Sequence, residues 1–434
     1  MKTDRRTGGG RFLELEGLRG IAALAVVFSH AISIFYMQML HGPNEPSIAS
    51  VQHMRFEDNL YANPIAALWS GTFAVAIFFV LSGFVLSIGY FQTGKVDILK
   101  KIAAKRYFRL MIPALVSILI CYALIALSLS SMQSAAAIIQ SDQLAKAWDF
   151  TPSIMTALYD GTVGVFIGGA NSYNPVLWTM AVEFLGSFMV FATLLLFSDS
   201  RYRALVYAVL LIALFNTWFM AFIIGMIFAD IYTKKRITAG KRKWYVLVSV
   251  LAISLYLGGY PYGEDLSHTL YAPFSIFSGL NIDMRMLSLT AAATLLVVGV
   301  LTIVQVANVL QRKPIRLLGK YSFSLYLVHL PILWIVTTQI FVWFSDLLGY
   351  NAAVVASLVL TIPIVWLATL TFAKFVDFKA VAFSSYFADV YMGKRSFVPK
   401  QALYRLRVAT KAMSGITLRR FSLMRRPVLD NEVD

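Results

Sequence analysis

The sequence predicts an all-α integral membrane protein, a bundle of about ten transmembrane helices with both termini in the cytoplasm. Composition is the first reason: 59% of the 434 residues are hydrophobic and 14% are charged, and the mean hydropathy is +0.70. The second is a series of long uncharged apolar runs. The third is an alternation of basic residues between the segments that connect those runs. Soluble globular domains lack these features.

The expected helices follow from the apolar runs, taken in order along the chain. They lie at about 18–40, 70–91, 107–129, 175–197, 202–215, 217–233, 243–259, 286–309, 320–344 and 352–376. The stretch 202–233 is the exception, because each half has only about 14 residues and a bilayer needs about 20. Both of its flanks are basic, so the charge pattern still requires two crossings there, with Asn216 at the turn.

Basic residues divide the connecting segments into two sides. The segments assigned to the outside hold only Arg55, Lys146 and Arg285. The remaining lysines and arginines lie on the opposite side, in clusters such as Lys100–Arg106, Lys234–Lys243 and Arg312–Lys320. Positive charge is retained in the cytoplasm, so the pattern predicts that both termini are cytoplasmic. The net charge of +16 therefore indicates topology and not nucleic-acid binding.

Three regions are expected: a cytoplasmic N-terminal segment at 1–17, a membrane domain at 18–376 and a basic cytoplasmic tail at 377–434. No small-residue cleavage site follows the basic N-terminus, which indicates an uncleaved first helix. From Tyr391 to Pro427 the tail has basic but no acidic residues, a composition suited to anionic membrane lipids. Cys121 is the single cysteine, so an intrachain disulfide is excluded and no metal site is expected.

Three ionisable residues are expected near the middle of the membrane. His30 follows Arg19 by eleven positions, so the two share a helix face and lie about 16 Å apart along the axis. Glu183 is expected about 12 Å and His329 about 13 Å inside their own spans. An ionisable group at that depth is costly unless it is paired or lines a polar cavity. The three residues therefore predict a polar functional site within the bundle.

Other polar residues accompany these three. Ser322 and Tyr326 precede His329 by seven and three positions, so the three share one helix face. Arg106 and Arg109 open the third span. With Arg19 they would form a positive ring at the cytoplasmic mouth of the bundle, where arginine suits bidentate capture of phosphate.

Most of these residues also have a purely structural explanation. Arg19 and Arg109 could reach lipid phosphates at helix ends. His329 could be a buried histidine bonded to Tyr326 or to a backbone carbonyl. Glu183 could form a structural ion pair with a histidine or an arginine.

Two small polar positions have a simpler interpretation still. Ser322 could be an ordinary helix-packing residue. The Ser82–Gly83 pair, within the segment Phe78–Phe84, is interpreted as a small-residue packing point and not as a nucleophile.

At these residues the chain resembles the acyltransferase-3 family, integral membrane acyltransferases that O-acylate bacterial surface glycans and some small molecules. The matching segments occur in family order and include the family's motif of an arginine and a histidine separated by ten residues. They are Leu15–His30, Phe78–Phe84, Arg106–Pro113, Trp178–Glu183 and Ser322–His329. In the third-span motif, Arg106 and Arg109 are both candidates for the family's arginine.

The resemblance implies an O-acyltransferase of the bacterial inner membrane. It would move an acyl group, with acetyl the expected one, from cytoplasmic acyl-CoA to a hydroxyl of an extracytoplasmic glycan. Exopolysaccharide and the O-antigen of lipopolysaccharide are the expected acceptors. Acetyl-CoA is then the donor substrate, and no metal is expected.

The resemblance also implies roles for the site residues. His30 is expected as the general base, oriented by Glu183, with His329 as a second candidate base. The remaining expected roles are phosphate binding by Arg19 with Arg106 or Arg109, and hydrogen-bond donation to the oxyanion by Tyr326 or Ser322. Direct transfer and an acyl-enzyme intermediate both remain open.

A proton-coupled transporter or flippase is the alternative, because proton relays also use mid-membrane His and Glu. Against it, the sequence contains no inverted repeat and no paired helix breaks. An acyltransferase consumes acyl-CoA and a transporter does not, so the release of CoA distinguishes the two. Aromatic residues of the outer segments, among them Trp69, Tyr260 and Tyr262, could stack on sugar rings, although aromatics are common at membrane interfaces in any case.

Overall fold

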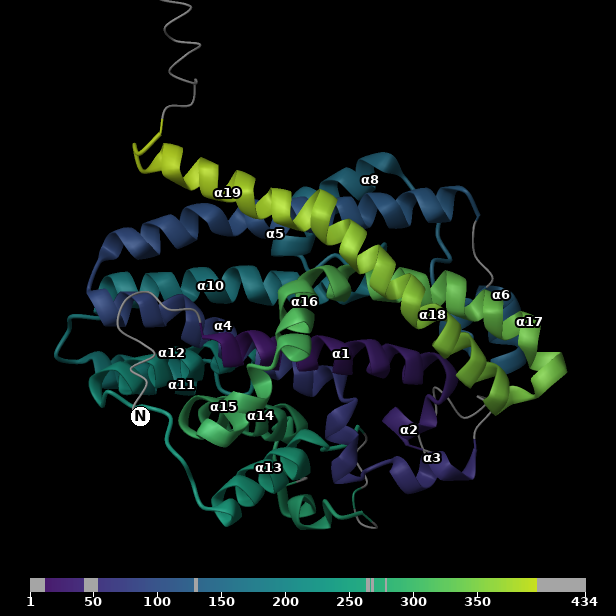
Figure 1. The fold of residues 1–434 in the computed structure, drawn as a ribbon, viewed down its shortest axis with the longest axis horizontal. Helices are drawn as coiled ribbons and strands as arrows, with labels where there is room; N and C mark the ends of the chain where they lie inside the picture. Colours follow the sequence, from purple (N-terminus) through teal and green to yellow (C-terminus); the bar gives the residue numbers. More distant parts are fainter. Residues whose placement is uncertain are drawn as a thin grey trace, which may run out of the picture. The chain divides into compact units, whose positions relative to one another are not determined.

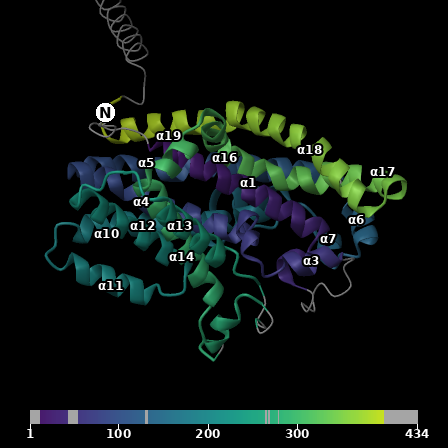
Figure 2. The same cartoon turned by 60° about the horizontal axis from the view of Figure 1, so that its bottom comes forward.

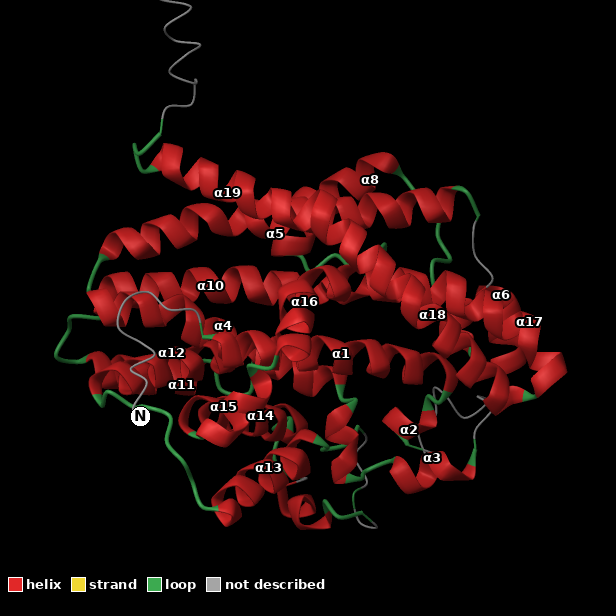
Figure 3. Cartoon of the chain, in the orientation of Figure 1, coloured by secondary structure: helices red, strands yellow, loops and turns green. Residues whose placement is uncertain are grey.

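The structure is a computed structural model that describes residues 12–42, 54–128, 132–262, 266, 269–277 and 279–395. Helices connected by turns and loops make up this part of the chain, and it contains no β-strand (Figure 3). The basic N-terminus up to Arg11 lies outside the described residues. So does most of the tail, from 396 onward, for which the sequence predicts contact with anionic lipid.

Seven of the described helices are long and apolar enough to cross a membrane. They are α1 (Leu13–Phe35), α4 (Gly71–Thr93), α5 (Val96–Ala126), α10 (Trp178–Phe197) with the preceding turn Pro175–Leu177, α14 (Met284–Thr302), α16 (Lys313–Ile332) continuing into α17 (Thr338–Leu348), and α18 (Tyr350–Phe372) continuing into α19 (Phe378–Tyr391). Each coincides with a predicted span. The prediction of an all-α membrane protein with many spanning helices is therefore confirmed.

The other three predicted spans are helical but short. They are α11 (Arg203–Ala213), α12 (Trp218–Lys234) and α13 (Trp244–Gly258). The turn between α11 and α12 contains Asn216 at a φ of +58°, as the sequence predicts. With 11, 17 and 15 residues, these helices are shorter than the roughly 20 residues that span a bilayer. Ten is therefore an approximate count of crossings.

Several predicted helix ends are wrong, among them the end of the first span, which lies at Phe35, and the start of the ninth, which lies at Lys313; two others affect the site. α5 begins at Val96 and not near 107, so Arg106 and Arg109 lie inside the helix. The last span was predicted to end at 376, but its helix continues without a break through Asp377. In both places the prediction stopped at charged residues, which are expensive in a membrane. The fold neutralises them within the bundle, where Arg109 pairs with Asp377 and Arg106 with Glu183.

The predicted outer segments contain short helices that the sequence analysis treated as loops. They are α2 (Gln38–His41), α3 (Arg55–Leu60), α6 (Met132–Ile139), α7 (Asp142–Ala145), α8 (Ile154–Tyr159) and α9 (Val165–Ile167). A π-helical turn joins α8 to α9 into one apolar helix, which packs against α5. Helices this short are stable only through tertiary packing, which is why their sequences give a weak signal.

Glycine lets α1 cross α16 with the two backbones in contact. A Cβ atom on Gly20 would lie 2.5 Å from the amide nitrogen of Gly319, and one on Gly319 would collide with the backbone carbonyl of Glu16. Small residues allow membrane helices to approach this closely. Figures 1 and 2 show α1 beside α16 from two directions. The crossing fixes the position of Arg19, one residue before Gly20.

Helix α4 lies at the centre of the bundle and packs most extensively against α12. A Cβ atom on Gly83 would collide with the backbone carbonyl of Phe222. The ring of Phe222 stacks on Phe79 with centroids 5.2 Å apart. The interpretation of Gly83 as a packing point is therefore confirmed, and the close contact fixes the rotation of α4 about its axis.

A proline in α16 connects this helix to the start of α10. Pro331 has no N–H, so the carbonyl of Leu327, four residues earlier, lacks its helical donor. The side-chain Nδ2 of Asn174 donates to that carbonyl at 2.9 Å. Asn174 is fully buried, and its own segment leads into α10. This hydrogen bond fixes the relative positions of the segments that contain Tyr326 and Thr179.

Candidate active site

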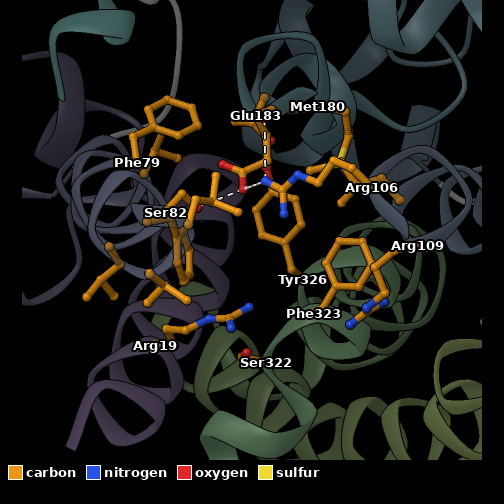
Figure 4. Close-up of a pocket in the computed structure, with 17 residues that line it drawn as sticks. Arg19, Phe79, Ser82, Arg106, Arg109, Met180, Glu183, Ser322, Phe323 and Tyr326 are labelled. Atoms are coloured by element: carbon orange, nitrogen blue, oxygen red, sulfur yellow. Dashed lines mark hydrogen bonds and ion pairs between the residues drawn. The ribbon is translucent and has the colours of Figure 1, made fainter. Parts of the chain in front are cut away.

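A cavity of about 220 Å³ lies between α1, α4, α5, α10 and α16, and each of the five sequence motifs contributes residues to it. We call it the three-arginine cavity, after Arg19, Arg106 and Arg109. Its other polar lining residues are Ser82, Thr179, Glu183, Ser322 and Tyr326 (Figure 4). Apolar side chains of α4, α5 and α16 complete the wall.

Glu183 is held by two partners on one side of this cavity. Arg106 forms an ion pair with Glu183 Oε1, and Ser82 Oγ donates to the same oxygen at 2.7 Å (Figure 4). The side chains of Arg106 and Glu183 are only 15% and 14% exposed. A carboxylate inside the membrane needs such a partner, and here an arginine supplies it.

Arg109 is neutralised in the same way by a residue that the sequence analysis assigned to the tail. Its Nη1 lies 2.5 Å from Asp377 Oδ1, and the second oxygen of Asp377 accepts a hydrogen bond from Ser324 at 3.1 Å. The guanidinium also lies over the ring of Phe323, 5.1 Å from its centroid. These contacts connect α5, α16 and the last long helix.

Arg19 differs from the other two arginines. Within the described part of the chain, no carboxylate forms an ion pair with it. Figure 4 shows its guanidinium extending into the cavity above Ser322, apart from the Arg106–Glu183 pair. The cavity therefore presents one uncompensated positive charge to a ligand.

The hydroxyl protons of Tyr326 and Ser322 are already engaged. Tyr326 donates to the carbonyl of Val176 at 2.5 Å and lies 2.8 Å from the hydroxyl of Thr179. Ser322 donates to the carbonyl of Gly319 at 2.9 Å. Neither hydroxyl is free to donate to an oxyanion in this arrangement. Helical spacing on one face predicted where the two side chains lie, but it gave no information about acceptors on the backbone.

His30 and His329 lie beside one another, with ring centroids 5.2 Å apart. His329 is fully buried, and its Nδ1 is 3.0 Å from the carbonyl oxygen of Leu325. A carbonyl only accepts, so Nδ1 bears the proton and Nε2 has a lone pair. No described residue forms a hydrogen bond with that Nε2. The pair therefore contains one nitrogen that is ready to accept a proton.

His30 lines a second cavity, which also measures about 220 Å³. We call it the Arg285 cavity. It lies toward the C-terminal end of α1 and the N-terminal end of α4, whereas the three-arginine cavity lies toward their opposite ends. Its polar and aromatic lining residues are Ser29, His30, Ser33, His41, Trp69, Ser70, Thr72, Gln143, Tyr260, Tyr262 and Arg285.

The comparison with known families decides what kind of protein this is. A family model described as an acyltransferase domain, that of the acyltransferase-3 family, matches residues 12–370. The chain is a member of the acyltransferase-3 family. No curated protein and no solved structure gives a significant match to it. Together with the seven spanning helices, the family makes this chain a multi-pass membrane acyltransferase.

The structure of this acyltransferase brings most of the predicted site residues together, but the contacts of Glu183, like those of Tyr326 and Ser322, differ from the expected ones. His30 and His329 meet, as expected, and the three arginines line one cavity. Glu183 does not hydrogen-bond to His30; it binds Arg106 and Ser82 in the other cavity. The prediction assumed that Arg106 lies at the membrane surface. Because α5 begins at Val96, ten residues before Arg106, Arg106 lies well inside the helix, where its side chain reaches Glu183.

Four residues of the site were missed or misread from the sequence. Ser82 was interpreted as a packing residue, Asp377 was assigned to the tail, and Asn174 was given no role. Arg285 was used only to assign topology. The signal in the sequence was weak in each case. Arg285 is nevertheless one of the few arginines assigned to the outer side, and this unusual position could have identified it as a candidate.

Proposed function

We propose that this acyltransferase moves an acetyl group from cytoplasmic acetyl-CoA to a hydroxyl of an extracytoplasmic glycan, such as exopolysaccharide or O-antigen. The observation that supports this most directly is the position of the His30–His329 pair. His30 lines the Arg285 cavity, and α1 continues from it to Arg19 in the three-arginine cavity. We further propose that the enzyme resides in the bacterial inner membrane with both termini in the cytoplasm.

The donor is proposed to enter the three-arginine cavity. Arg19 provides a cation without a carboxylate partner, and arginine suits the phosphates of CoA. A volume of about 220 Å³ is below the roughly 300–1,000 Å³ of pockets that enclose whole drug-sized ligands. The cavity would therefore hold the phosphates of CoA and not the whole donor, while the pantetheine arm extends along α1 and brings the thioester to His30.

The acceptor hydroxyl is proposed to enter the Arg285 cavity, on the side where the sequence predicts the outside. Tyr260, Tyr262 and Trp69 line this cavity, and aromatic rings suit the faces of sugars. His30 would then contact the acceptor hydroxyl directly. Separate cavities for donor and acceptor would let one substrate enter from each side of the membrane.

Proton transfer at the histidine pair completes the proposed reaction. His30 removes the proton of the attacking hydroxyl as its oxygen bonds to the thioester carbon. The C–S bond breaks, and His30 gives that proton to the leaving thiolate. CoA therefore leaves as the thiol, and atoms and charge balance. Nε2 of His329 lies within the pair with a free lone pair and is the second group that could hold the proton.

Glu183, Tyr326 and Ser322 are proposed as positioning residues for this reaction. Glu183 holds Arg106 and Ser82 at the cavity wall. Tyr326 connects α16 to the start of α10 through the carbonyl of Val176. Ser322 bonds within its own helix at the cavity wall.

The test is transfer of labelled acetyl from acetyl-CoA to a crude surface-glycan acceptor in membranes. His30→Ala is expected to lower the rate about 10²- to 10⁴-fold at equal protein level, the usual contribution of a general base. Phe28→Ala is the matched control, because Phe28 lies on the same helix, is 45% exposed and lines neither cavity.

Equal transfer by wild type and His30→Ala would exclude His30 as the base and transfer that role to His329. Release of no CoA with any acceptor, together with movement of a solute across the membrane, would contradict the proposed reaction and favour the transporter. Wild-type transfer that His30→Ala abolishes and Phe28→Ala retains would support the proposal.

A further inference from the structure

The Arg285 cavity contains an arginine whose guanidinium has no acidic partner. Within the described part of the chain, no carboxylate forms an ion pair with Arg285. Its Nη2 donates to the hydroxyl of Thr72, and its Nε is buried without a hydrogen-bond partner. A buried positive charge without a counterion is costly. Such a charge on a cavity wall suits an anionic ligand.

The surrounding side chains fix this guanidinium in place. Its Cζ lies 3.4 Å from the centroid of the Tyr262 ring, and His41 stacks on Tyr262 with centroids 4.7 Å apart. Tyr61 in turn donates to the backbone carbonyl of Tyr262. A guanidinium that is already ordered loses little conformational entropy when it binds a ligand.

Buried hydrogen-bond donors without acceptors distinguish this wall, as far as the structure describes it. Trp69 also lines the cavity, and its buried Nε1–H has no acceptor among the described residues. No Asp or Glu of the described chain lines the cavity. Burial, with a smaller contribution from Asp283, raises the pKa of Tyr260, so its phenol stays neutral at physiological pH. Among the described residues, this wall therefore has buried donors without acceptors and no acidic side chain.

Asp283, the acidic residue two positions before Arg285, is engaged elsewhere. The carboxylate of Asp283 accepts a hydrogen bond from the amide of Met286 at 2.9 Å and caps the first turn of α14. It does not line the cavity. The charge of Asp283 acts on Arg285, but no described carboxylate forms an ion pair with the guanidinium, which remains able to bind an anion.

We propose that the acceptor is an acidic glycan whose carboxylate binds Arg285 and Trp69 while a neighbouring hydroxyl faces His30. This inference rests on the proposed function. One guanidinium matches one monoanionic carboxylate, which it binds through two parallel hydrogen bonds. A phosphate has more charge and three acceptor oxygens, and sites for it commonly gather several cations or backbone amides. A uronate-type sugar therefore fits this wall best.

A binding measurement tests this inference without requiring catalysis. The detergent-solubilised full chain is titrated with a labelled trisaccharide of glucuronate and with the glucose trisaccharide of the same linkage, by equilibrium dialysis. The acidic trisaccharide is expected to bind at least ten times more tightly, because a charged hydrogen-bonded pair contributes about 1.5–3 kcal/mol and 1.4 kcal/mol is tenfold. Arg285→Gln is expected to remove this preference.

Two other variants keep the test decisive if Arg285→Gln does not fold. Trp69→Phe removes one N–H while it retains an aromatic ring, and it is expected to weaken glucuronate binding about threefold. Arg55→Gln is the matched control, because Arg55 is an exposed arginine on the same predicted side and lies outside the cavity. It is expected to leave the Kd for the acidic trisaccharide unchanged.

Each outcome supports or overturns the inference. Equal affinity for the two trisaccharides, or binding of neither, would overturn it. Displacement of the labelled glucuronate trisaccharide by glycerol 3-phosphate at a lower concentration than by free glucuronate would also overturn it. That result would indicate a phosphate or lipid-headgroup site. The acetyl-transfer assay with His30→Ala is scored separately. Acetyl transfer to a neutral glycan without a preference for glucuronate would retain the proposed function and reject this inference.

Discussion

The three-arginine cavity and the Arg285 cavity have the same volume, about 220 Å³, and differ in how their positive charges are balanced. In the first, Arg106 and Arg109 are paired with Glu183 and Asp377. In the second, no described acidic residue lines the wall. Each cavity nevertheless contains an arginine that no described carboxylate pairs. The comparison teaches that paired arginines connect helices, whereas unpaired ones are available to ligands.

The two cavities are also built on the same helices. α1 contributes Arg19 to one and His30 to the other, and α4 contributes Ser82 and Thr72. Eleven residues of helix separate Arg19 from His30, a rise of about 16 Å. A rigid helix shared by both cavities therefore sets the distance between the proposed phosphate site at Arg19 and the acceptor cavity, which the pantetheine arm of CoA would have to span.

The largest expected effect comes from breaking a paired arginine. Glu183→Ala is expected to lower the free energy of unfolding by about 3–5 kcal/mol, because it leaves Arg106 buried without a counter charge. The measurement is equilibrium unfolding in mixed micelles. Arg19→Gln is the comparison, and its unfolding free energy is expected to stay within about 0.5 kcal/mol of wild type. Equal losses in the two variants would contradict the distinction between paired and unpaired arginines.

The next effect concerns donor binding. Arg19→Gln is expected to raise the KM for acetyl-CoA about tenfold or more, because a hydrogen bond to a charged group contributes about 1.5–3 kcal/mol. The measurement is initial-rate kinetics of CoA release at saturating acceptor. Arg201→Gln serves as the control, because it removes an exposed arginine that bonds only to Tyr202. An unchanged KM in Arg19→Gln would remove Arg19 from the donor site.

The smallest effect comes from releasing a paired arginine without removing it. Asp377→Asn retains an acceptor for Ser324 but takes away the charge that faces Arg109. The freed Arg109 adds a cation to the three-arginine cavity. It is expected to lower the KM for acetyl-CoA about two- to threefold, as partly screened charges interact weakly. The same kinetic assay measures this change, and a rise in KM would show that Asp377 positions Arg109 for the donor.

Helix positions were largely predictable from the sequence, whereas partners between helices were not. All ten predicted spans are helical, because apolar runs and hydrogen-bond satisfaction in lipid leave few alternatives. The ends of α5 and of the last long helix were misplaced, because charged residues there are neutralised by distant residues. Sequence spacing cannot reveal a pair such as Arg109 and Asp377, which lie 268 positions apart.

The sequence by itself determined the helical membrane architecture, the family motifs and the depth of the histidines along their helices. Those properties follow from local patterns: apolar length, 3.6-residue periodicity and a rise of 1.5 Å per residue. Only the tertiary structure decided that Glu183 faces Arg106 while His30 faces His329. The rotation of each helix about its axis depends on contacts such as Gly20 on Gly319 and Gly83 on Phe222, which involve residues far apart in the chain.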